Sequence, residues 1–342
     1  MHLASLDAMV KQCKVVVSTV GPFAKYGSEL VAACVRHGRD YCDITGEVHW
    51  VRSMIDQHHQ AAKTSGARIV HCCGFDSIPS DLGTLLLQQE GIKRYGSPFN
   101  QVNFYVIKAR GGFSGGTAAS MLNLFEQLER TPSLRRSLAN PYVLNPKGER
   151  HGLDTRDQMG VRYDSDVPGF TAPFVMAAVN TRVVRRSNAL LNYRYGHDFR
   201  YRETMCFKPS AKGLASAAAI TTALVAFMAA AALPITRKQL QQRLLPAPGE
   251  GPTQQQRDKG MFEVLLIGKG TGDDGAPTQL RAKVAGNKDP GYGETCKMLA
   301  ESALCLAHDR ELPTDGGILT PASCMGLVLV ERLRRAGITF SV

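Results

Sequence analysis

Two carboxylates and two hydroxyls follow short apolar segments near the start of the chain. Glu47 and Asp76 each come just after one such segment, and Ser18 and Thr19 close an earlier one. Hydroxyls of this kind can bind a ribose or an amide, and a carboxyl group can deliver a proton. For each acid alone, the simpler interpretation is a helix N-terminal residue stabilised by the helix dipole. If the three segments end at one edge of a sheet, the four side chains define one ligand site.

The elements that must position these residues follow a repeating order. Strand-like runs at 15–19, 41–45 and 68–73 are each followed by a helical pattern, which is the spacing of successive βα units in a parallel sheet. In such sheets, ligands bind outside the carboxyl ends of the strands. The predicted rim therefore consists of Thr19-Val20-Gly21-Pro22-Phe23, Thr45-Gly46-Glu47 and Gly74-Phe75-Asp76-Ser77.

The first run indicates a sheet that is incomplete at its N-terminal side. Val15-Val16-Val17 is an unbroken apolar run, typical of a strand that is covered on both faces and paired on both edges. Residues 1–14 hold at most one short helix, and no G-x-G-x-x-G stands between a strand and a helix near the start. We therefore expect an α/β fold with an N-terminally incomplete Rossmann-type parallel sheet, lacking roughly 60 to 80 residues of a first βαβ unit upstream.

An α+β second domain is predicted to follow. Its expected strands are 102–107, 200–207, 261–268 and 279–285, its expected helices are 294–306 and 321–335, and 246–260 is a linker rich in Pro, Gly and Gln. The predicted domains are 1–98 for the partial Rossmann-type unit, 99–320 for the second domain, and 321–342 for a C-terminal helix and strand that pack back on the first domain.

A glycine loop at 111–117 follows the first strand of that second domain. It either aims backbone N–H groups at an anion or is a plain turn with Thr117 as the N-cap of the next helix. The loop lacks the Lys-Ser/Thr of a P-loop, which argues against a nucleoside triphosphate.

The net charge of +11 is concentrated in one region. Residues 182–243 hold eleven basic side chains and two acidic ones, and within them residues 213–236 carry no charge. Three interpretations of the uncharged segment stay open, namely a buried core helix, an interfacial helix on a lipid surface, and a transmembrane helix. Flanking Lys and Arg favour an anionic surface. No nucleic-acid reader motif accompanies the basic residues, so we expect no nucleic-acid partner.

Cysteine and histidine placement argues against disulfides and metals. The nine cysteines are odd in number, scattered and without a C-x-x-C pair, which suits reduced thiols in a cytosol-like compartment. The first residues lack the blocks of a signal peptide, so we expect a cytoplasmic protein that is not secreted. His58 and His59 point to different faces of a helix, and 71–73 alternate across a strand, so no metal site is predicted.

Several longer motifs, in the expected order, resemble one known family. The chain is similar to the saccharopine dehydrogenase-like oxidoreductases at 16–23 (VVSTVGPF), 40–47 (DYCDITGE) and 68–81 (RIVHCCGFDSIPSD). The segments 112–117 (GFSGGT), 180–187 (NTRVVRRS) and 319–322 (LTPA) resemble the branch that includes trans-acting enoyl reductases of long-chain lipid synthesis. The resemblance runs essentially from residue 5 to the C-terminus.

The resemblance implies hydride transfer from a nicotinamide cofactor, NADPH or NADH, into an activated double bond of a lipid- or polyketide-type substrate. A proton must then reach the adjacent carbon, and Tyr26, Asp76 and Ser77 stay open as its donor. The residues expected to hold the cofactor are Ser18, Thr19, Val20, Gly21, Pro22, Phe23, Gly46, Glu47, Gly74 and Phe75.

The resemblance also implies contact with lipid surfaces, because eukaryotic members of the family are associated with membranes and lipid droplets. Together with the charges of 182–243, it predicts peripheral association with an anionic membrane or lipid-droplet surface and a role in glycolipid biosynthesis; a homodimer stays open. Two other functions remain. One is a lipid-surface protein without catalysis, and the other is an amino-acid dehydrogenase in which Arg182, Arg185 and Arg186 bind substrate carboxylates.

Overall fold

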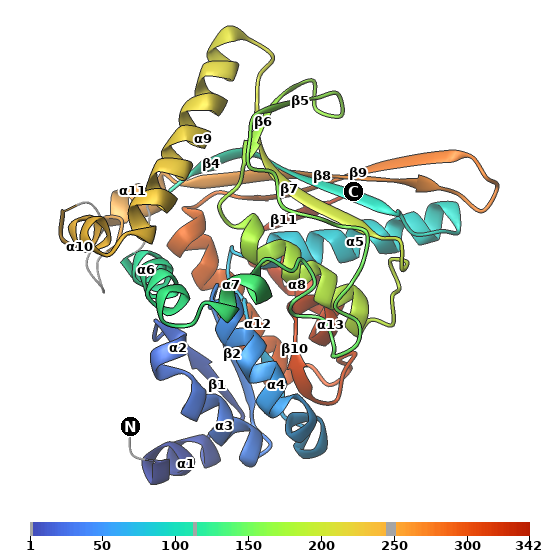
Figure 1. The fold of residues 1–342 in the computed structure, drawn as a ribbon. Helices are drawn as coiled ribbons and strands as arrows, with labels where there is room; N and C mark the ends of the chain where they lie inside the picture. The colour runs from blue at the N-terminus through green and yellow to red at the C-terminus, as the bar shows by residue number, and fades with distance from the viewer. Residues whose placement is uncertain (1–2, 112–114, 244–250) are drawn as a thin grey trace.

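The protein, seen here as a computed structural model that describes residues 3–111, 115–243 and 251–342, is built on two sheets (Figure 1). Within these ranges the first sheet holds four parallel strands in the order β1-β2-β3-β10, which confirms the predicted Rossmann-type parallel sheet. Its strands are β1 (Val15–Ser18), β2 (Asp40–Asp43), β3 (Arg68–Val70) and β10 (Gly317–Leu319).

Helices connect these strands at the positions that the apolar periodicity predicts. Gly66 ends one of them and Gly96 another, with φ of 75° and 77°, a left-handed conformation that glycine adopts without steric cost. The helices of this unit are α1 (Leu3–Lys11), α2 (Phe23–Tyr26), α3 (Ser28–Arg36), α4 (Val48–Ser65) and α5 (Ile78–Tyr95).

Strand β1 lies at an edge of the first sheet. In the part of the chain that the structure describes, it pairs with β2 alone and lies at an edge of the sheet. Val16 and Ser18 are buried, whereas Val17 is 46% exposed. Successive side chains of a strand point to opposite faces, so the face that carries Val15 and Val17 is left uncovered at Val17. The unpaired edge of β1 agrees with the predicted incomplete sheet, in which the first neighbour of this strand is missing.

The second sheet confirms the predicted α+β unit. Its order is β11-β9-β8-β4-β7-β6-β5, and its pairs are antiparallel except β4 with β7. The strands are β4 (Gln101–Arg110), β5 (Arg162–Asp164), β6 (Gly169–Pro173), β7 (Arg200–Phe207), β8 (Met261–Thr271), β9 (Pro277–Gly286) and β11 (Thr339–Ser341).

The remaining helices pack around this sheet and between the two sheets (Figure 1). They are α6 (Gly115–Arg130), α7 (Ser133–Leu138), α8 (Ala177–Leu190), α9 (Ala211–Ala232), α10 (Pro234–Arg243), α11 (Gln254–Asp258), the π-helical turn η1 (Pro290–Glu294), α12 (Thr295–His308), α13 (Pro321–Cys324) and α14 (Gly326–Arg335). Residues 112–114 of the predicted glycine loop lie outside the described ranges. Because α6 begins at Gly115, Thr117 lies inside this helix and is not its N-cap.

One core ties the two sheets together. Val70 of β3, Leu82 of α5, Phe104 of β4 and Leu329 of α14 belong to a single buried apolar cluster. The C-terminal part of the chain contributes to both sheets, because β10 joins the first sheet beside β3 and β11 pairs with β9 in the second. The loops at the carboxyl ends of β1, β2 and β3 are thereby held against elements of the second unit.

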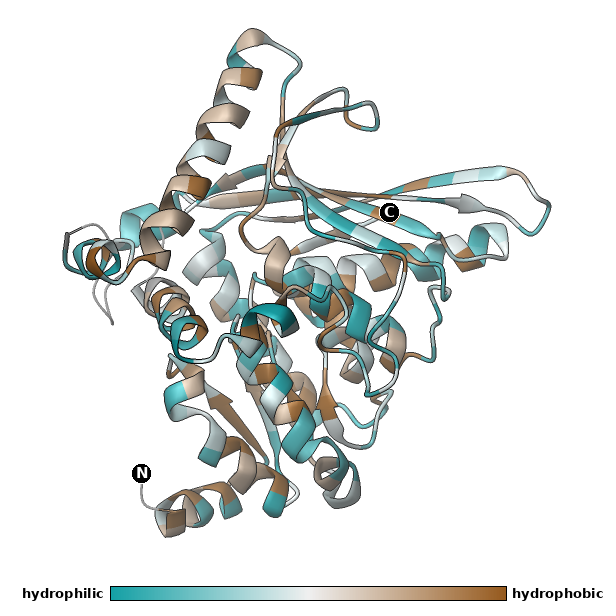
Figure 2. Cartoon of the chain, in the orientation of Figure 1, coloured by the Kyte–Doolittle hydropathy of each residue, from teal (hydrophilic) through white to brown (hydrophobic). Residues whose placement is uncertain are grey.

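Helix α9 projects away from the body of the molecule (Figure 1), and its surface is largely apolar (Figure 2). Gly213, Ala217 and Ala231 are its buried residues, and only 11% of its most apolar 18-residue stretch is buried. The interpretation of 213–236 as a buried core helix was therefore wrong. Among the helices in the described ranges, α9 alone is long and apolar enough to cross a membrane.

Candidate functional site

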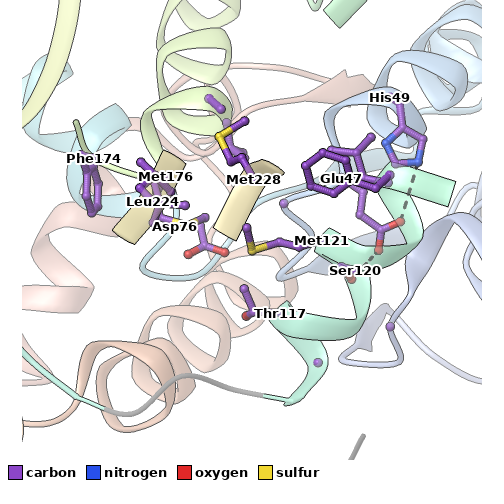
Figure 3. A pocket seen from close by; sticks show the side chains of 18 of the residues that line it. Glu47, His49, Asp76, Thr117, Ser120, Met121, Phe174, Met176, Leu224 and Met228 are labelled. Atoms are coloured by element: carbon purple, nitrogen blue, oxygen red, sulfur yellow. Dashed lines mark hydrogen bonds and ion pairs between the residues drawn. The ribbon is translucent and has the colours of Figure 1, made fainter. Parts of the chain in front are cut away.

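An apolar cavity of about 300 Å³ opens at the carboxyl ends of β1, β2 and β3 (Figure 3). Thr19 and Gly21 reach it from the turn after β1, Gly46 and Glu47 from the loop after β2, and Asp76 from the loop after β3. This is the edge at which open parallel sheets bind their ligands, and the volume is that of a small-molecule site. The structure thus brings residues of all three predicted rim loops together.

Glu47 fixes the geometry of two of these loops. It is 4% exposed, and its carboxylate accepts the backbone N–H of Phe23 at 2.7 Å and that of Ala24 at 3.0 Å. Ser120 of α6 donates its hydroxyl to the same carboxylate at 2.8 Å. Glu47 therefore caps the N-terminus of a helix, which is the simpler of the two interpretations. The helix that it caps is α2, and not α4, which follows Glu47 in the sequence.

His49 lies beside Glu47 in the wall of the cavity (Figure 3). Its Nε2 is 4.0 Å from Oε2 of Glu47. Burial lowers the pKa of His49 to about 4, because the interior disfavours the charged ring. At neutral pH, His49 is an uncharged imidazole and adds no positive charge to the site.

Asp76 carries the carboxyl group that is left for chemistry. It lines the cavity, and the residues described by the structure give it no hydrogen-bond partner. Burial raises the pKa of Asp76 to about 6, because no nearby cation or donor offsets the desolvation of the charged form. A carboxylic acid that titrates near neutral pH in a cavity is a candidate proton donor or acceptor.

The loop that carries Asp76 is anchored on the second unit. The backbone N–H of Phe75 donates to Oγ1 of Thr295 at 3.0 Å, and the Phe75 ring contacts the Phe262 ring with centroids 4.9 Å apart. A Cβ added at Gly74 would lie 3.1 Å from Thr295, so a larger residue would fit only if the Thr295 side chain shifted. Gly74 and Phe75 were predicted to hold the cofactor, but they hold the loop and do not line the cavity.

The other two predicted proton donors also lie elsewhere. Ser77 is fully buried and donates its hydroxyl to Oδ1 of Asn180 at 3.2 Å. Tyr26 ends α2 and is 49% exposed, outside the set of residues that line the cavity. The structure therefore brings only Asp76, of the three predicted donors, to the site.

The turn after β1 reaches the cavity through alternate residues. Thr19, Gly21 and Phe23 line it, whereas Val20 is 61% exposed on the outside of the turn and Ser18 is buried beneath it. Pro22 follows Gly21 through a cis peptide bond and does not line the cavity. Of the ten residues predicted to hold the cofactor, those that line the cavity are Thr19, Gly21, Phe23, Gly46 and Glu47.

A buried pair below the rim supports the loops after β2 and β3. Asp43 Oδ2 lies 2.7 Å from Nδ1 of His71. Its other oxygen, Oδ1, accepts the backbone N–H groups of Thr45 at 3.1 Å and of Cys72 at 3.2 Å. Cys72 adopts a φ of 63°, so this carboxylate holds the backbone where β3 turns into its loop.

Most of the apolar wall comes from elements distant in sequence. Met121 and Phe125 on α6, Phe174 after β6, and Leu224 and Met228 on α9 face the cavity (Figure 3 labels four of them). The sequence shows the apolar character of α9, but nothing local indicates that it pairs with α6. The sequence therefore predicted the loops at the edge of the cavity but not the apolar side chains that form its wall.

The basic residues of 182–243 do not form one continuous surface. Arg182, Arg185 and Arg186 on α8 are buried, and none of them faces the cavity. Arg186 donates to the carbonyls of Leu144 and Ile318, each at 2.5 Å. The other internal pairs are Arg182 with Asp157, Arg185 with Asp154 (2.7 Å), Arg202 with Asp164 (2.9 Å) and Arg237 with Glu129 (3.0 Å). The set proposed to bind the carboxylates of an amino acid is thus committed to internal contacts.

A parallel sheet with an apolar cavity at its carboxyl edge, joined to a second, mostly antiparallel sheet, defines a Rossmann-type α/β protein with a small-molecule site. No protein-family profile matches the chain. It is 37% identical over 346 residues to the trans-acting enoyl reductase of Mycobacterium bovis, covering 98% of this chain and 81% of that protein. It is 35% identical over 348 residues to the trans-acting enoyl reductase of Mycobacterium ulcerans, covering 99% and 82%.

The chain belongs to the family of trans-acting enoyl reductases, which are oxidoreductases. This confirms the branch that the sequence motifs resemble. A saccharopine dehydrogenase structure from Saccharomyces cerevisiae is similar with a TM-score of 0.46 and 12% identity, covering 99% of this chain and 86% of that one.

Proposed function

We propose that this protein is a nicotinamide-dependent enoyl reductase that reduces an activated carbon–carbon double bond in a lipid- or polyketide-type substrate. The observation that carries the proposal is the apolar cavity into which the carboxyl group of Asp76 projects, at the carboxyl edge of a parallel sheet. The names of relatives that match nearly the whole chain support the reaction class.

The cavity wall fits the nicotinamide end of a cofactor. A Cβ added at Gly21 would lie 3.7 Å from Phe23 and Ser120, and one at Gly46 would lie 3.6 Å from Asp76. These two positions therefore expose backbone to the cavity, where a flat ring can approach it closely. Thr19, Gly21 and Gly46 would hold the ring, with the exposed hydroxyl of Thr19 as a polar partner. NADPH and NADH both remain candidates. When bound, the cofactor supplies the hydride.

Asp76 performs the proton step in this proposal. Reduction adds one hydride and one proton across the double bond, so the carbon next to the one that receives hydride must take a proton. Asp76 keeps its proton up to a pH of about 6 and faces the cavity. Apolar side chains such as Met121, Phe125 and Leu224 hold the acyl part of the substrate and exclude water from the reacting carbons.

The direct test is turnover with defined substrates. Purified protein is mixed with NADPH or NADH and a long-chain trans-2-enoyl thioester, and both cofactor oxidation and the saturated product are measured. We expect one saturated product per oxidised cofactor, and a loss of roughly 10²-fold or more in kcat for Asp76→Asn. Asp315→Asn, at an exposed position outside the cavity, is the control. Absence of product with both cofactors and with substrates of several chain lengths would overturn the proposal.

A lipid-surface role is a second proposal, favoured by α9. Leu214 and Val225 are 44% and 49% exposed on its outer face. Residues 208–243 contain no acidic side chain, and the exposed Lys208 and Lys212 stand at one end of the helix. An apolar face flanked by cations suits the surface of an anionic membrane or lipid droplet.

Flotation with liposomes tests this surface role. We expect the protein to float with anionic vesicles at low salt and to release from them as the salt concentration rises. Recovery only in the unbound fraction, with anionic and zwitterionic vesicles alike, would contradict it. Because flotation needs no turnover, its outcome is independent of the reductase proposal.

A further inference from the structure

A second hollow of about 670 Å³ lies beside the apolar cavity, at the start of β7. It is lined by the segment 153–160, by Arg162 of β5, and by the first residues of β4 and β7. Asp157, Gln158 and Met159 line both hollows. The short segment 157–159 therefore forms the partition between the apolar cavity and its polar neighbour.

The partition is held by hydrogen bonds. Gln158 donates through Nε2 to the carbonyl of Gly160 at 2.8 Å and to that of Thr171 at 3.2 Å. Asp157 accepts the hydroxyl of Thr181 at 3.1 Å and pairs with Arg182. A ligand that occupies both hollows would therefore lie across the segment 157–159, which these hydrogen bonds hold in place.

Most charged groups around the second hollow neutralise one another. Glu203 is buried and accepts hydrogen bonds from Asn180 at 2.9 Å and from the hydroxyl of Tyr201 at 2.7 Å. Burial raises the pKa of Glu203 to about 7, so about half of its carboxyl groups are uncharged at neutral pH. The ion pairs at its edge are Asp154 with Arg185, Asp157 with Arg182 and Arg202 with Asp164.

Three arginines that line the hollow have no carboxylate partner in the described ranges. Arg156, Arg162 and Arg200 line it, and all three are exposed. Across the described ranges, no carboxylate pairs with any of them and none donates a side-chain hydrogen bond. Three cations around one concave surface repel one another and create a positive potential that an anion relieves. The guanidinium fork matches the oxygens of a phosphate group better than any other side chain does.

We propose that Arg156, Arg162 and Arg200 bind a phosphate group of a small-molecule ligand in this hollow. The placement beside the apolar cavity gives two sources for that phosphate, and both rest on the proposed reductase function. One is a phosphate-bearing carrier group on the acyl substrate, whose chain lies in the apolar cavity, and the other is the 2′-phosphate of NADPH, which NADH lacks.

Equilibrium binding of inorganic pyrophosphate tests the site itself. The variant Arg156→Gln/Arg162→Gln/Arg200→Gln removes the three cations from exposed positions. The matched control, Lys93→Gln/Arg194→Gln/Arg310→Gln, removes three exposed cations elsewhere. We expect calorimetric titration to show binding weakened at least about tenfold in the first variant and unchanged in the control. Equal binding by the wild-type protein and the first variant would overturn the proposal.

Two further titrations separate the sources of the phosphate. If the substrate carries it, the triple variant binds a trans-2-enoyl-coenzyme A at least about tenfold more weakly but binds the same acyl chain on N-acetylcysteamine normally. If NADPH carries it, the variant loses affinity for NADPH and keeps its affinity for NADH. An unchanged affinity for both phosphate-bearing ligands counts against the site. These measurements need no hydride transfer, so they stand even if the protein reduces no enoyl substrate.

Discussion

The carboxylate of Glu47 accepts the backbone N–H of Phe23 at 2.7 Å and thereby joins the loop after β2 to the turn after β1. The same carboxylate also accepts hydrogen bonds from the backbone N–H of Ala24 and from the hydroxyl of Ser120. Together these three contacts fix the shape of the rim. A side chain that already accepts three hydrogen bonds has little capacity left for a ligand.

Glu47→Gln should therefore lower stability as well as activity. The amide keeps one acceptor oxygen but places N–H groups against backbone N–H donors, which costs about 1–3 kcal/mol in the free energy of unfolding. Urea denaturation followed by circular dichroism measures the loss. Glu311→Gln, an exposed acid with no side-chain partner in the described ranges, should unfold like the wild-type protein. If Glu47→Gln unfolded with the same free energy as the wild-type protein, Glu47 would not hold the two loops together.

The acid form of Asp76 should govern the pH dependence of turnover. Its pKa of about 6 means that the fraction holding a proton falls as the pH rises through that value. We expect kcat/KM for a trans-2-enoyl thioester to decrease tenfold per pH unit above about 6. A profile that stays flat from pH 5 to about 8 would remove Asp76 as the proton donor.

The same pKa predicts how Asp76 affects stability. Its folded pKa lies above the unfolded value of 3.8, so the folded state holds one more proton between these two values. Stability therefore falls as the pH rises from about 4 to 6 and stays lowered above that range. Asp76→Asn should be more stable than the wild-type protein at pH 7, by up to about 3 kcal/mol, and equal to it near pH 4. Denaturant titrations at both pH values measure the difference.

Leu224 should set the length of acyl chain that the cavity accepts. Leu224→Trp adds volume to the wall between α9 and α6, so KM for a long-chain enoyl thioester should rise about tenfold or more while that of a short-chain one changes little. Leu214→Trp, on the outer face of the same helix, is the control. Equal effects of the two substitutions would mean that the acyl chain does not reach α9.

The outer face of α9 should tolerate charge without loss of stability. Leu214→Glu/Val225→Glu alters two exposed side chains, so the free energy of unfolding should change by no more than about 0.5 kcal/mol. Flotation with anionic vesicles should be abolished, whereas Leu304→Glu on α12 should float like the wild-type protein. Undiminished flotation of the double variant would place lipid contact elsewhere.

The sequence predicted the fold better than it predicted the site. The runs at 15–19, 41–45 and 68–73 are strands of one parallel sheet because their apolar patterning is local and strong. Asp76, Thr19, Gly21 and Gly46 meet because the carboxyl ends of parallel strands share one edge.

What sequence reasoning missed depends on pairings between distant elements. That α9 and α6 close the cavity follows from tertiary packing that no local pattern encodes. The basic count of 182–243 was misleading for the same reason. Arg182 and Arg185 meet Asp157 and Asp154, acids outside that region, and Arg186 meets backbone carbonyls. Counting charges along the sequence does not show which basic side chains form ion pairs with acids from distant segments.

Isotope transfer follows the hydride from the cofactor into the product. The protein is incubated with a long-chain trans-2-enoyl thioester and reduced cofactor that carries deuterium at the transferable position of the nicotinamide ring, and the product is analysed by mass spectrometry. We expect a saturated product with deuterium at one of the two former double-bond carbons and a solvent proton at the other, and strongly reduced formation of that product by Asp76→Asn. Recovery of unreduced substrate from the wild-type protein, with NADPH and NADH alike, would contradict it.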